Sequence, residues 1–404
     1  MSTPYPSTPR SEERPRVAAL VTLFLVSAFI FANMYTTQAI LPVLGEDFHV
    51  SAPTAGLTVS VLVLAVAIGA LFYGPISDLV GRKPVMVVAS LLVTIPTLLC
   101  GFAPNFALLV VLRALQGLLI AGLTSVAIAY VNEEFRGKGR GLAMGIYVSG
   151  LTLGGLFART GSAALTGFFS WRVAMLAFAP PTLIAALMMW KFLPDTYGKK
   201  GRQLEKRSSE SGAAFVRQTL SDMALHLHNR RLVGAFIIGF ASFFGFIGIF
   251  TYLPYYLTGP LFRLPTIALS LVYLLWLTGI FSPAAGTLAG RIGSRRSIAL
   301  SNSLAIVGLL ITLVPVLPIV LVGLGLLTLG MFSTLPAANL YLGEQALTAK
   351  GTAASMYLSL YYFGGSLGAV LPGLLLERTG WPGVALLCVG MTLLSLTADA
   401  LLCR

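Results

Sequence analysis

Long apolar runs, separated by short polar connections that contain Gly or Pro, dominate the chain from residue 17 onward. A helix that crosses a bilayer needs about 20 mostly apolar residues, and the chain holds about twelve segments of that kind. The predicted spans are 17–41, 55–76, 85–103, 106–131, 141–166, 172–193, 232–257, 266–289, 297–315, 317–341, 351–375 and 381–401. The pattern therefore predicts an all-α membrane protein with 12 transmembrane helices.

A polar stretch rich in Lys, Arg, Glu and Ser divides these spans into two sets of six. The predicted organisation is a cytoplasmic tail at 1–16, an N-terminal six-helix bundle at 17–193, a cytoplasmic linker at 194–231 and a C-terminal six-helix bundle at 232–401. Within the linker, residues 213–227 could lie as an amphipathic helix on the membrane surface.

Landmarks of the first half recur in the second. Pro42 is echoed by Pro254, and Trp171 by Trp381, each about half a chain later. Six helices in each half give both copies the same orientation, so the halves should be related by a pseudo-two-fold axis along the membrane normal.

The composition excludes a soluble domain. Only 10% of the residues are Asp, Glu, Lys or Arg, whereas soluble domains carry about 25%. Most of the 27 cations fall in segments on one side of the predicted membrane, which places both termini in the cytoplasm. This asymmetry explains the net charge of +13 without a nucleic-acid partner.

The chain shows no pattern for a metal, a disulfide or a cofactor. Its 3 cysteines are scattered through the spans. His226 and His228 form an isolated HxH in the polar linker, which is typical of a solvated loop rather than a metal site. There is no nucleophile–base cluster and no phosphate-binding Walker loop, so we expect neither an enzyme nor an ATP-driven pump.

The connection between the second and third spans reads GPISDLVGRKP, Gly74 to Pro84, and a weaker copy, GTLAGRIGSRR, begins at Gly286. Asp78 lies beside Arg82 at the end of a helix. A carboxylate there can bond cations and the positive N-terminal end of a neighbouring helix. The weaker copy has Gly290 where the first has Asp78.

GPISDLVGRKP resembles the loop 2–3 signature of the major facilitator superfamily. RALQGLLIAG, Arg113 to Gly122, resembles its helix 4 motif, and SGLTLGG, Ser149 to Gly155, resembles the Gly-rich helix 5 motif associated with antiporters. The chain is most similar to the twelve-helix drug–proton antiporter branch of bacterial inner-membrane exporters. It departs from that motif at Leu151, where Pro is common.

The resemblance implies two moving parts. The first is a conformational latch, formed by Gly74, Asp78, Gly81, Arg82 and Arg136. The alternative is a surface ion pair that contributes about 0–1 kcal/mol. The second is a glycine seam, along which the halves move, formed by Gly145, Gly150, Gly154 and Gly155. Small residues four apart also serve static helix packing, which is the alternative for the seam.

Two arginines lie inside predicted spans, Arg113 and Arg159. A cation in the bilayer costs about 2.5–3.5 kcal/mol on translocon scales, so it normally faces a cavity and has a partner. Asn33, Gln38 and Gln116 fall in a similar layer and could line that cavity. Alternatively, Arg159 snorkels to the headgroups, and Arg113 bonds backbone carbonyls of the first helix.

Aromatic and polar residues of the second half complete the candidate substrate site. They are Tyr252, Tyr256, Trp276, Asn339, Tyr357 and Tyr361. A cavity lined by aromatic rings and a few polar groups suits amphipathic organic molecules. The alternative role for each of these residues is helix packing or membership of an aromatic belt at the membrane interface.

The function predicted is secondary active transport by alternating access, most simply proton-coupled efflux of a small organic compound across a bacterial inner membrane by a monomer. The alternative is transport or exchange of an organic or phosphorylated anion bound by the intramembrane arginines. No Asp or Glu falls in the middle of a span, which favours neutral or anionic substrates. Protons would then move through Asp78, the glutamates after the fourth span, Asp399 or the substrate itself.

Overall fold

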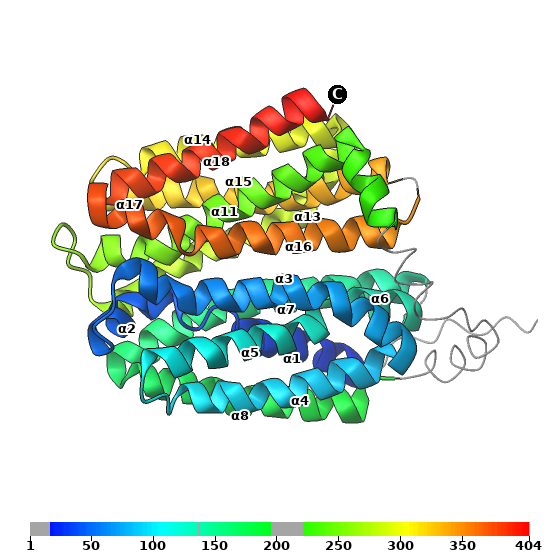
Figure 1. Ribbon diagram of the computed structural model, residues 1–404, viewed down its shortest axis with the longest axis horizontal. Helices are drawn as coiled ribbons and strands as arrows, with labels where there is room; N and C mark the ends of the chain where they lie inside the picture. Colours follow the sequence, from blue (N-terminus) through cyan, green and yellow to red (C-terminus); the bar gives the residue numbers. More distant parts are fainter. Residues whose placement is uncertain (1–16, 136, 195–220, 347, 404) are drawn as a thin grey trace, which may run out of the picture.

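The computed structural model describes residues 17–135, 137–194, 221–346 and 348–403. The described chain forms two helical bundles that lie side by side along their length (Figure 1). The first bundle consists of α1 (Val17–Ala32), η1 (Gln38–Ile40), α2 (Leu41–Asp47), α3 (Ala52–Val80), α4 (Arg82–Cys100), α5 (Phe106–Thr124), α6 (Ala127–Glu134), α7 (Gly137–Phe168) and α8 (Trp171–Phe192). The second consists of α11 (Arg230–Thr258), α12 (Thr266–Val272), η2 (Tyr273–Phe281), α13 (Ser282–Ile292), α14 (Ser294–Ile311), α15 (Leu317–Gln345), α16 (Lys350–Gly368), α17 (Leu371–Thr379) and α18 (Trp381–Leu402).

Ten of the twelve predicted spans coincide with described helices that are long and apolar enough to cross a membrane. The other two, at 297–315 and 17–41, fall outside that set. The span predicted at 297–315 is α14, whose first turn carries Arg295 and Arg296. The span predicted at 17–41 is interrupted after Ala32. The prediction of an all-α membrane protein with 12 transmembrane helices in two six-helix bundles is confirmed.

The expectation of one continuous first helix over 17–41 was wrong. Residues 33–37 form turns, η1 follows, and the helix resumes as α2 with Pro42 in its first turn. A break inside a membrane leaves backbone carbonyls without helical partners, and these need donors from elsewhere in the protein. Arg113 supplies them, since it donates to the carbonyl oxygens of Asn33 and Met34 at 2.6 and 2.8 Å.

The two ends of the molecule carry different parts of the chain. The terminal end is the one where the described chain begins at Val17 and finishes at Cys403; the loop end is opposite and carries the connections 48–51 and 259–265. The bundles meet along α3 and α16, which run side by side in Figure 1, and along α7 and α12.

Contacts between the bundles run from the loop end to the middle of the molecule. Hydrogen bonds join Gln38 to Thr251, Tyr255 to Leu41, Ser60 to Ser366 and Ser359 to Ala67. Toward the terminal end, a Cβ atom added at Gly74, Gly145 or Gly351 would meet nothing within 4 Å. The arrangement is therefore closed at the loop end.

The linker is described from residue 221 onward, and residues 221–228 are helical. The first part of the amphipathic helix expected at 213–227 lies outside the described residues. His226 departs from the solvated loop that we expected. It is 3% exposed, and its Nε2 atom lies 3.3 Å from the carbonyl oxygen of Ala349, because this short helix packs against the second bundle.

Candidate functional site

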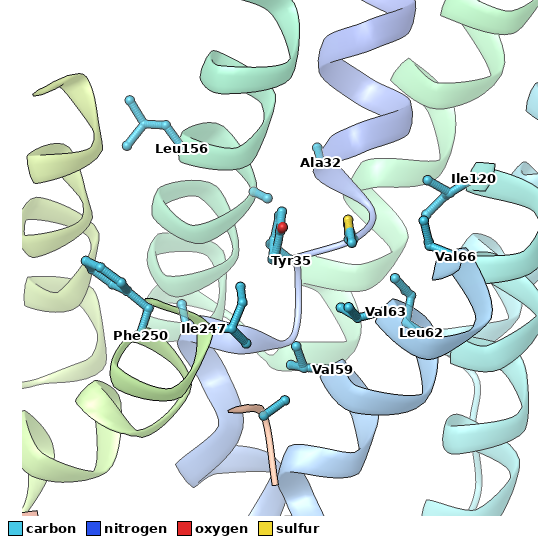
Figure 2. Close-up of a cluster of buried hydrophobic side chains, with 14 of the residues drawn as sticks. Ala32, Tyr35, Val59, Leu62, Val63, Val66, Ile120, Leu156, Ile247 and Phe250 are labelled. Atoms are coloured by element: carbon cyan, nitrogen blue, oxygen red, sulfur yellow. The ribbon is translucent and has the colours of Figure 1, made fainter. Parts of the chain in front are cut away.

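The break in the first span brings polar groups to the centre of the molecule. Figure 2 shows Tyr35 on the non-helical stretch after Ala32. The labelled side chains of Val59, Leu62, Val63 and Val66 on α3 lie to one side of it, and Ile247 and Phe250 on α11 lie to the other. Residues 33–38 therefore lie where both bundles approach, and their surroundings are otherwise apolar.

Arg113 is fully buried, and each of its three guanidinium nitrogens donates to a protein oxygen. Besides the two carbonyls at the helix break, its Nε atom donates to the carbonyl oxygen of Thr58 at 2.9 Å, and Nη1 donates to Gln116 Oε1 at 2.9 Å. All these partners belong to the first bundle. The geometry favours the alternative interpretation, in which Arg113 bonds the carbonyls of the first helix.

Asn33 and Gln116 belong to the same internal network. Asn33 Nδ2 donates to Thr182 on α8 at 2.9 Å, and its Oδ1 accepts from Thr97 on α4 at 2.9 Å. Gln116 Nε2 donates to Thr97 Oγ1, also at 2.9 Å. These side chains tie the turn after α1 to α4, α5 and α8 inside the first bundle, so the contacts that the structure shows for them are structural.

Arg159 differs from Arg113 because one of its guanidinium nitrogens is unpaired. Like Arg113, it is fully buried; its Nε donates to Gln38 Oε1 at 2.7 Å, and its Nη1 donates to the Gly155 carbonyl oxygen at 2.6 Å. Its third nitrogen, Nη2, is buried and has no hydrogen-bond partner. The alternative that Arg159 snorkels to the headgroups is wrong, because the side chain is held inside the protein.

Aromatic rings cover the Arg159 guanidinium. Its central carbon lies 3.9 Å from the centre of the Tyr35 ring and 3.6 Å from the centre of the Trp276 ring. Cation–π contacts of this kind are strongest where water is excluded. The Trp276 indole nitrogen Nε1 is likewise buried and without a partner. Phe246 and Phe250 on α11 lie against the same indole at 4.9 and 5.6 Å between ring centres.

The two bundles share this group of residues, which we call the Arg159 cluster: Tyr35, Gln38, Gly155, Arg159 and Trp276. The first four lie in the first bundle, and Trp276 lies in the second. Gln38 extends the connection, because its Nε2 atom donates to Thr251 Oγ1 on α11 at 2.9 Å. Sequence reasoning missed Tyr35 and Thr251. Tyr35 stands between Asn33 and Gln38, and that polar stretch was the available signal.

The other predicted site residues of the second half lie elsewhere. The Tyr252 hydroxyl donates to the Ala369 carbonyl oxygen at 2.7 Å, at the break between α16 and α17. Tyr256 stacks on Trp381 with 4.3 Å between ring centres. Tyr361 stacks on Phe243 at 3.9 Å and lies 6.2 Å from Tyr357. Asn339 is exposed on α15. None of these hydrogen bonds and ring stacks involves a residue of the Arg159 cluster.

The loop motif forms a tight junction at the terminal end. Gly81 has φ of 106°, a left-handed conformation that favours glycine. Arg82 pairs with Glu133 at 3.1 Å, and Arg82 Nη1 donates to Ser77 Oγ at 2.5 Å. The Asp78 side chain and the whole of Arg136 lie outside the described part of the chain. The latch therefore remains a prediction for them.

The weaker copy of the motif forms a matching junction. Gly293 has φ of 93°, Ser294 Oγ donates to Glu344 at 2.9 Å, and Arg295 lies 3.5 Å from Asp399. The repeat seen in the sequence therefore corresponds to a repeat in three dimensions.

The glycines of the predicted seam divide into three kinds. A Cβ at Gly150 or Gly154 would overlap Ser27 or Ala28 of α1, so these two lie against a helix of their own bundle. Gly155 faces Arg159 and Trp276, each 3.4 Å from the position of an added Cβ. Gly145 has nothing within 4 Å. The contact at Gly150 and Gly154 is packing within the first bundle.

Comparisons with known proteins agree on one family. The family model described as Major Facilitator Superfamily matches residues 23–279 and 262–403. The inner membrane transport protein YnfM of Escherichia coli is 35% identical over 387 residues, which cover 95% of this chain and 90% of that protein. The uncharacterized MFS-type transporter YybF of Bacillus subtilis is 32% identical over 375 residues, 93% of this chain and 90% of the relative. A crystal structure of the nucleoside transporter NupG matches the fold with a TM-score of 0.76 at 16% identity, covering 96% of this chain and 100% of that one.

Proposed function

This chain belongs to the Major Facilitator Superfamily of membrane transporters, and we propose that it is a secondary active transporter that works by alternating access. The observation that carries the proposal is the asymmetry between the two ends. Hydrogen bonds such as Ser60–Ser366 hold the bundles together toward the loop end, while Gly74 and Gly145 toward the terminal end have no neighbour where a side chain would start. Access to a central site would then alternate between the terminal end and the loop end.

The transported compound is a small organic molecule, and the mode is proton-coupled efflux across a bacterial inner membrane, as in the antiporters that the motifs resemble. The terminal end carries most of the cations, which supports a cytoplasmic location for both termini. It also carries the partly buried pairs Arg82–Glu133 and Arg295–Asp399. Their carboxylates are the candidate proton carriers, together with Asp78.

A second candidate function is transport or exchange of an organic or phosphorylated anion. Arg159 favours it, because the hydrogen bonds of this buried cation go to an amide and a backbone carbonyl. An isolated buried charge is costly unless it is paired. An anionic substrate would supply the missing counter-charge.

Transport in proteoliposomes tests both candidates. We would impose a pH gradient and follow a panel of cationic, neutral and anionic compounds. Uphill movement of a compound when protons flow back supports the antiporter, and movement of anions alone supports the second candidate. If no compound moves faster than in protein-free liposomes, and none of the panel exchanges across the membrane, the transporter proposal fails.

A further inference from the structure

Two buried donors of the Arg159 cluster have nothing to donate to. Arg159 Nη2 and Trp276 Nε1 both lie out of contact with solvent and lack an acceptor. Because buried N–H groups are almost always paired, each such exception calls for an explanation. The guanidinium carbon lies 3.6 Å from the centre of the indole ring, so the two unpaired donors belong to side chains in direct contact.

The cluster carries one positive charge, so we expect the acceptor group to carry one negative charge. Arg159 is its one cation, and Tyr35, Gln38 and Trp276 are neutral. The guanidinium already uses Nε and Nη1 on Gln38 and Gly155, so it has a single nitrogen left to offer. A carboxylate, with one negative charge and two acceptor oxygens, matches one free cationic donor and one indole N–H. A phosphate dianion would bring a second charge with no cation to meet it.

The aromatic side chains around the cluster indicate the chemistry of the part of the ligand that is not the carboxylate. Besides Tyr35 and Trp276, the rings of Phe246 and Phe250 lie within 5.6 Å of the indole, measured between ring centres. Flat rings pack edge-to-face or offset against such groups. An aromatic body would complement this environment better than a sugar or an amine.

The position of the cluster connects binding to transport. Arg159 belongs to α7 of the first bundle, and Trp276 belongs to η2 of the second. A ligand held by both donors spans the boundary between the bundles, so it would favour one arrangement of the halves over the other. In the loop-end-closed arrangement the donors are covered, and entry of a ligand requires the bundles to shift.

We propose that the Arg159 cluster is the binding site for a small aromatic monocarboxylate, whose carboxylate accepts from Arg159 Nη2 and Trp276 Nε1. The proposal rests on the transporter function proposed above and narrows its substrate class. It assigns no ligand contact to Arg113, whose donors are already used.

Direct binding tests this assignment. Purified protein would be titrated with radiolabelled benzoate, the simplest aromatic carboxylate, in competition with unlabelled benzamide and phenyl phosphate. We expect saturable binding of benzoate, with weak displacement by the neutral amide and by the phosphate dianion. Arg159→Gln should weaken binding about 10- to 100-fold, because it removes a hydrogen bond to a charged group. Trp276→Phe keeps an aromatic ring but removes the N–H, and should weaken binding several-fold.

Arg172→Gln is the matched control. Arg172 is an exposed cation near the loop end that pairs with Asp47 at 3.0 Å, and it lies outside the cluster. Its loss should leave benzoate affinity unchanged. Elution from a size-exclusion column as a single species and an unchanged melting temperature would show that each variant folds. If Arg159→Gln does not fold, the benzoate affinity of Trp276→Phe tests the proposal.

The proposal is overturned if benzoate does not bind, if benzamide or phenyl phosphate displaces it as well as benzoate does, or if the folded cluster variants bind normally. Two further results distinguish failure of this binding site from failure of the proposed transporter function. Transport of a neutral compound that Arg159→Gln does not affect would keep the transporter and reject this site. Arg159-dependent benzoate binding, with no transport of any compound, would keep the site and reject the transporter.

Discussion

The hydroxyl oxygens of Ser60 and Ser366 lie 2.9 Å apart, although one belongs to α3 and the other to α16 of the opposite bundle. Both side chains are buried, at 8% and 2% exposure. Close by, a Cβ atom at Gly56 would overlap the carbonyl group of Ala369, so the two backbones are in direct contact. Alternating access requires this contact to open, and that requirement can be tested.

A disulfide between Cys side chains at positions 60 and 366 should stop transport. The double variant Ser60→Cys/Ser366→Cys would place two sulfur atoms where two oxygens now hydrogen-bond at 2.9 Å, close enough for oxidation to a disulfide. The cross-link would hold the bundles together and prevent the loop end from opening. Transport should fall to background after oxidation and recover after reduction with dithiothreitol.

The control for this experiment lies inside one bundle. The hydroxyls of Ser242 and Ser395 lie 3.2 Å apart within the second bundle. Oxidised Ser242→Cys/Ser395→Cys should therefore keep its transport rate, and the 3 native cysteines, all buried, should contribute little background. Full transport by the oxidised 60/366 variant, with the cross-link verified, would contradict alternating access through this contact.

Helix α7 offers a matched pair of glycines. Gly154→Leu should destabilise the protein, because its side chain would collide with the Ala28 backbone of α1, and overpacking costs about 1–3 kcal/mol or more. Gly145→Leu should be tolerated, since nothing lies within 4 Å of its added Cβ. Thermal unfolding of the purified variants measures the difference. If Gly154→Leu melts like the wild type but no longer transports, the moving seam is the better interpretation.

Apolar length and the half-chain repeat were sufficient to predict the fold. The predicted spans at 172–193 and 381–401 differ from α8 and α18 by at most one residue at each end. These helices begin at Trp171 and Trp381, directly after Ser170 and Gly380, which gave a clear boundary in the sequence. A uniformly apolar segment with a sharp polar edge leaves little freedom in where a membrane helix begins.

The candidate site was harder to predict, because its defining feature is the absence of a partner. Arg113 and Arg159 look alike in the sequence, each a single cation in an apolar span. What separates them is whether a broken helix offers carbonyls nearby, as Asn33 and Met34 do for Arg113. The break over 33–37 is a tertiary effect, and an apolar window cannot reveal it.

The junction at Arg82 should matter for transport far more than for stability. Arg82 and Glu133 are partly exposed, at 21% and 27%, and such pairs contribute about 0–1 kcal/mol or less after screening. If the loop motif is a latch, Arg82→Gln and Asp78→Asn should each reduce transport at least about tenfold, which corresponds to about 1.4 kcal/mol in the equilibrium between the two arrangements. Their melting temperatures should stay close to that of the wild type.

The corresponding turn of the second bundle supplies the control for the latch. Arg296 is exposed at the start of α14. Arg296→Gln should transport normally. Equal transport by Arg82→Gln, Asp78→Asn and Arg296→Gln would reduce the motif to a surface ion pair.

Arg113 should prove to be a stability residue. Arg113→Ala removes the guanidinium donors to the carbonyl oxygens of Asn33, Met34 and Thr58. The Asn33 oxygen keeps a hydrogen bond of 3.4 Å from Thr36 Oγ1, whereas a buried acceptor left unpaired costs about 1–3 kcal/mol. Arg113→Lys should be nearly as damaging, because an ammonium group cannot reproduce the planar fork that reaches three acceptors in different directions. Thermal unfolding in detergent, with the exposed Arg172→Ala as the control, measures the loss. If Arg113→Ala folds, melts like the wild type and fails only in substrate binding, Arg113 is a substrate-binding residue. The same result would contradict its role as the donor that stabilises the break in the first helix.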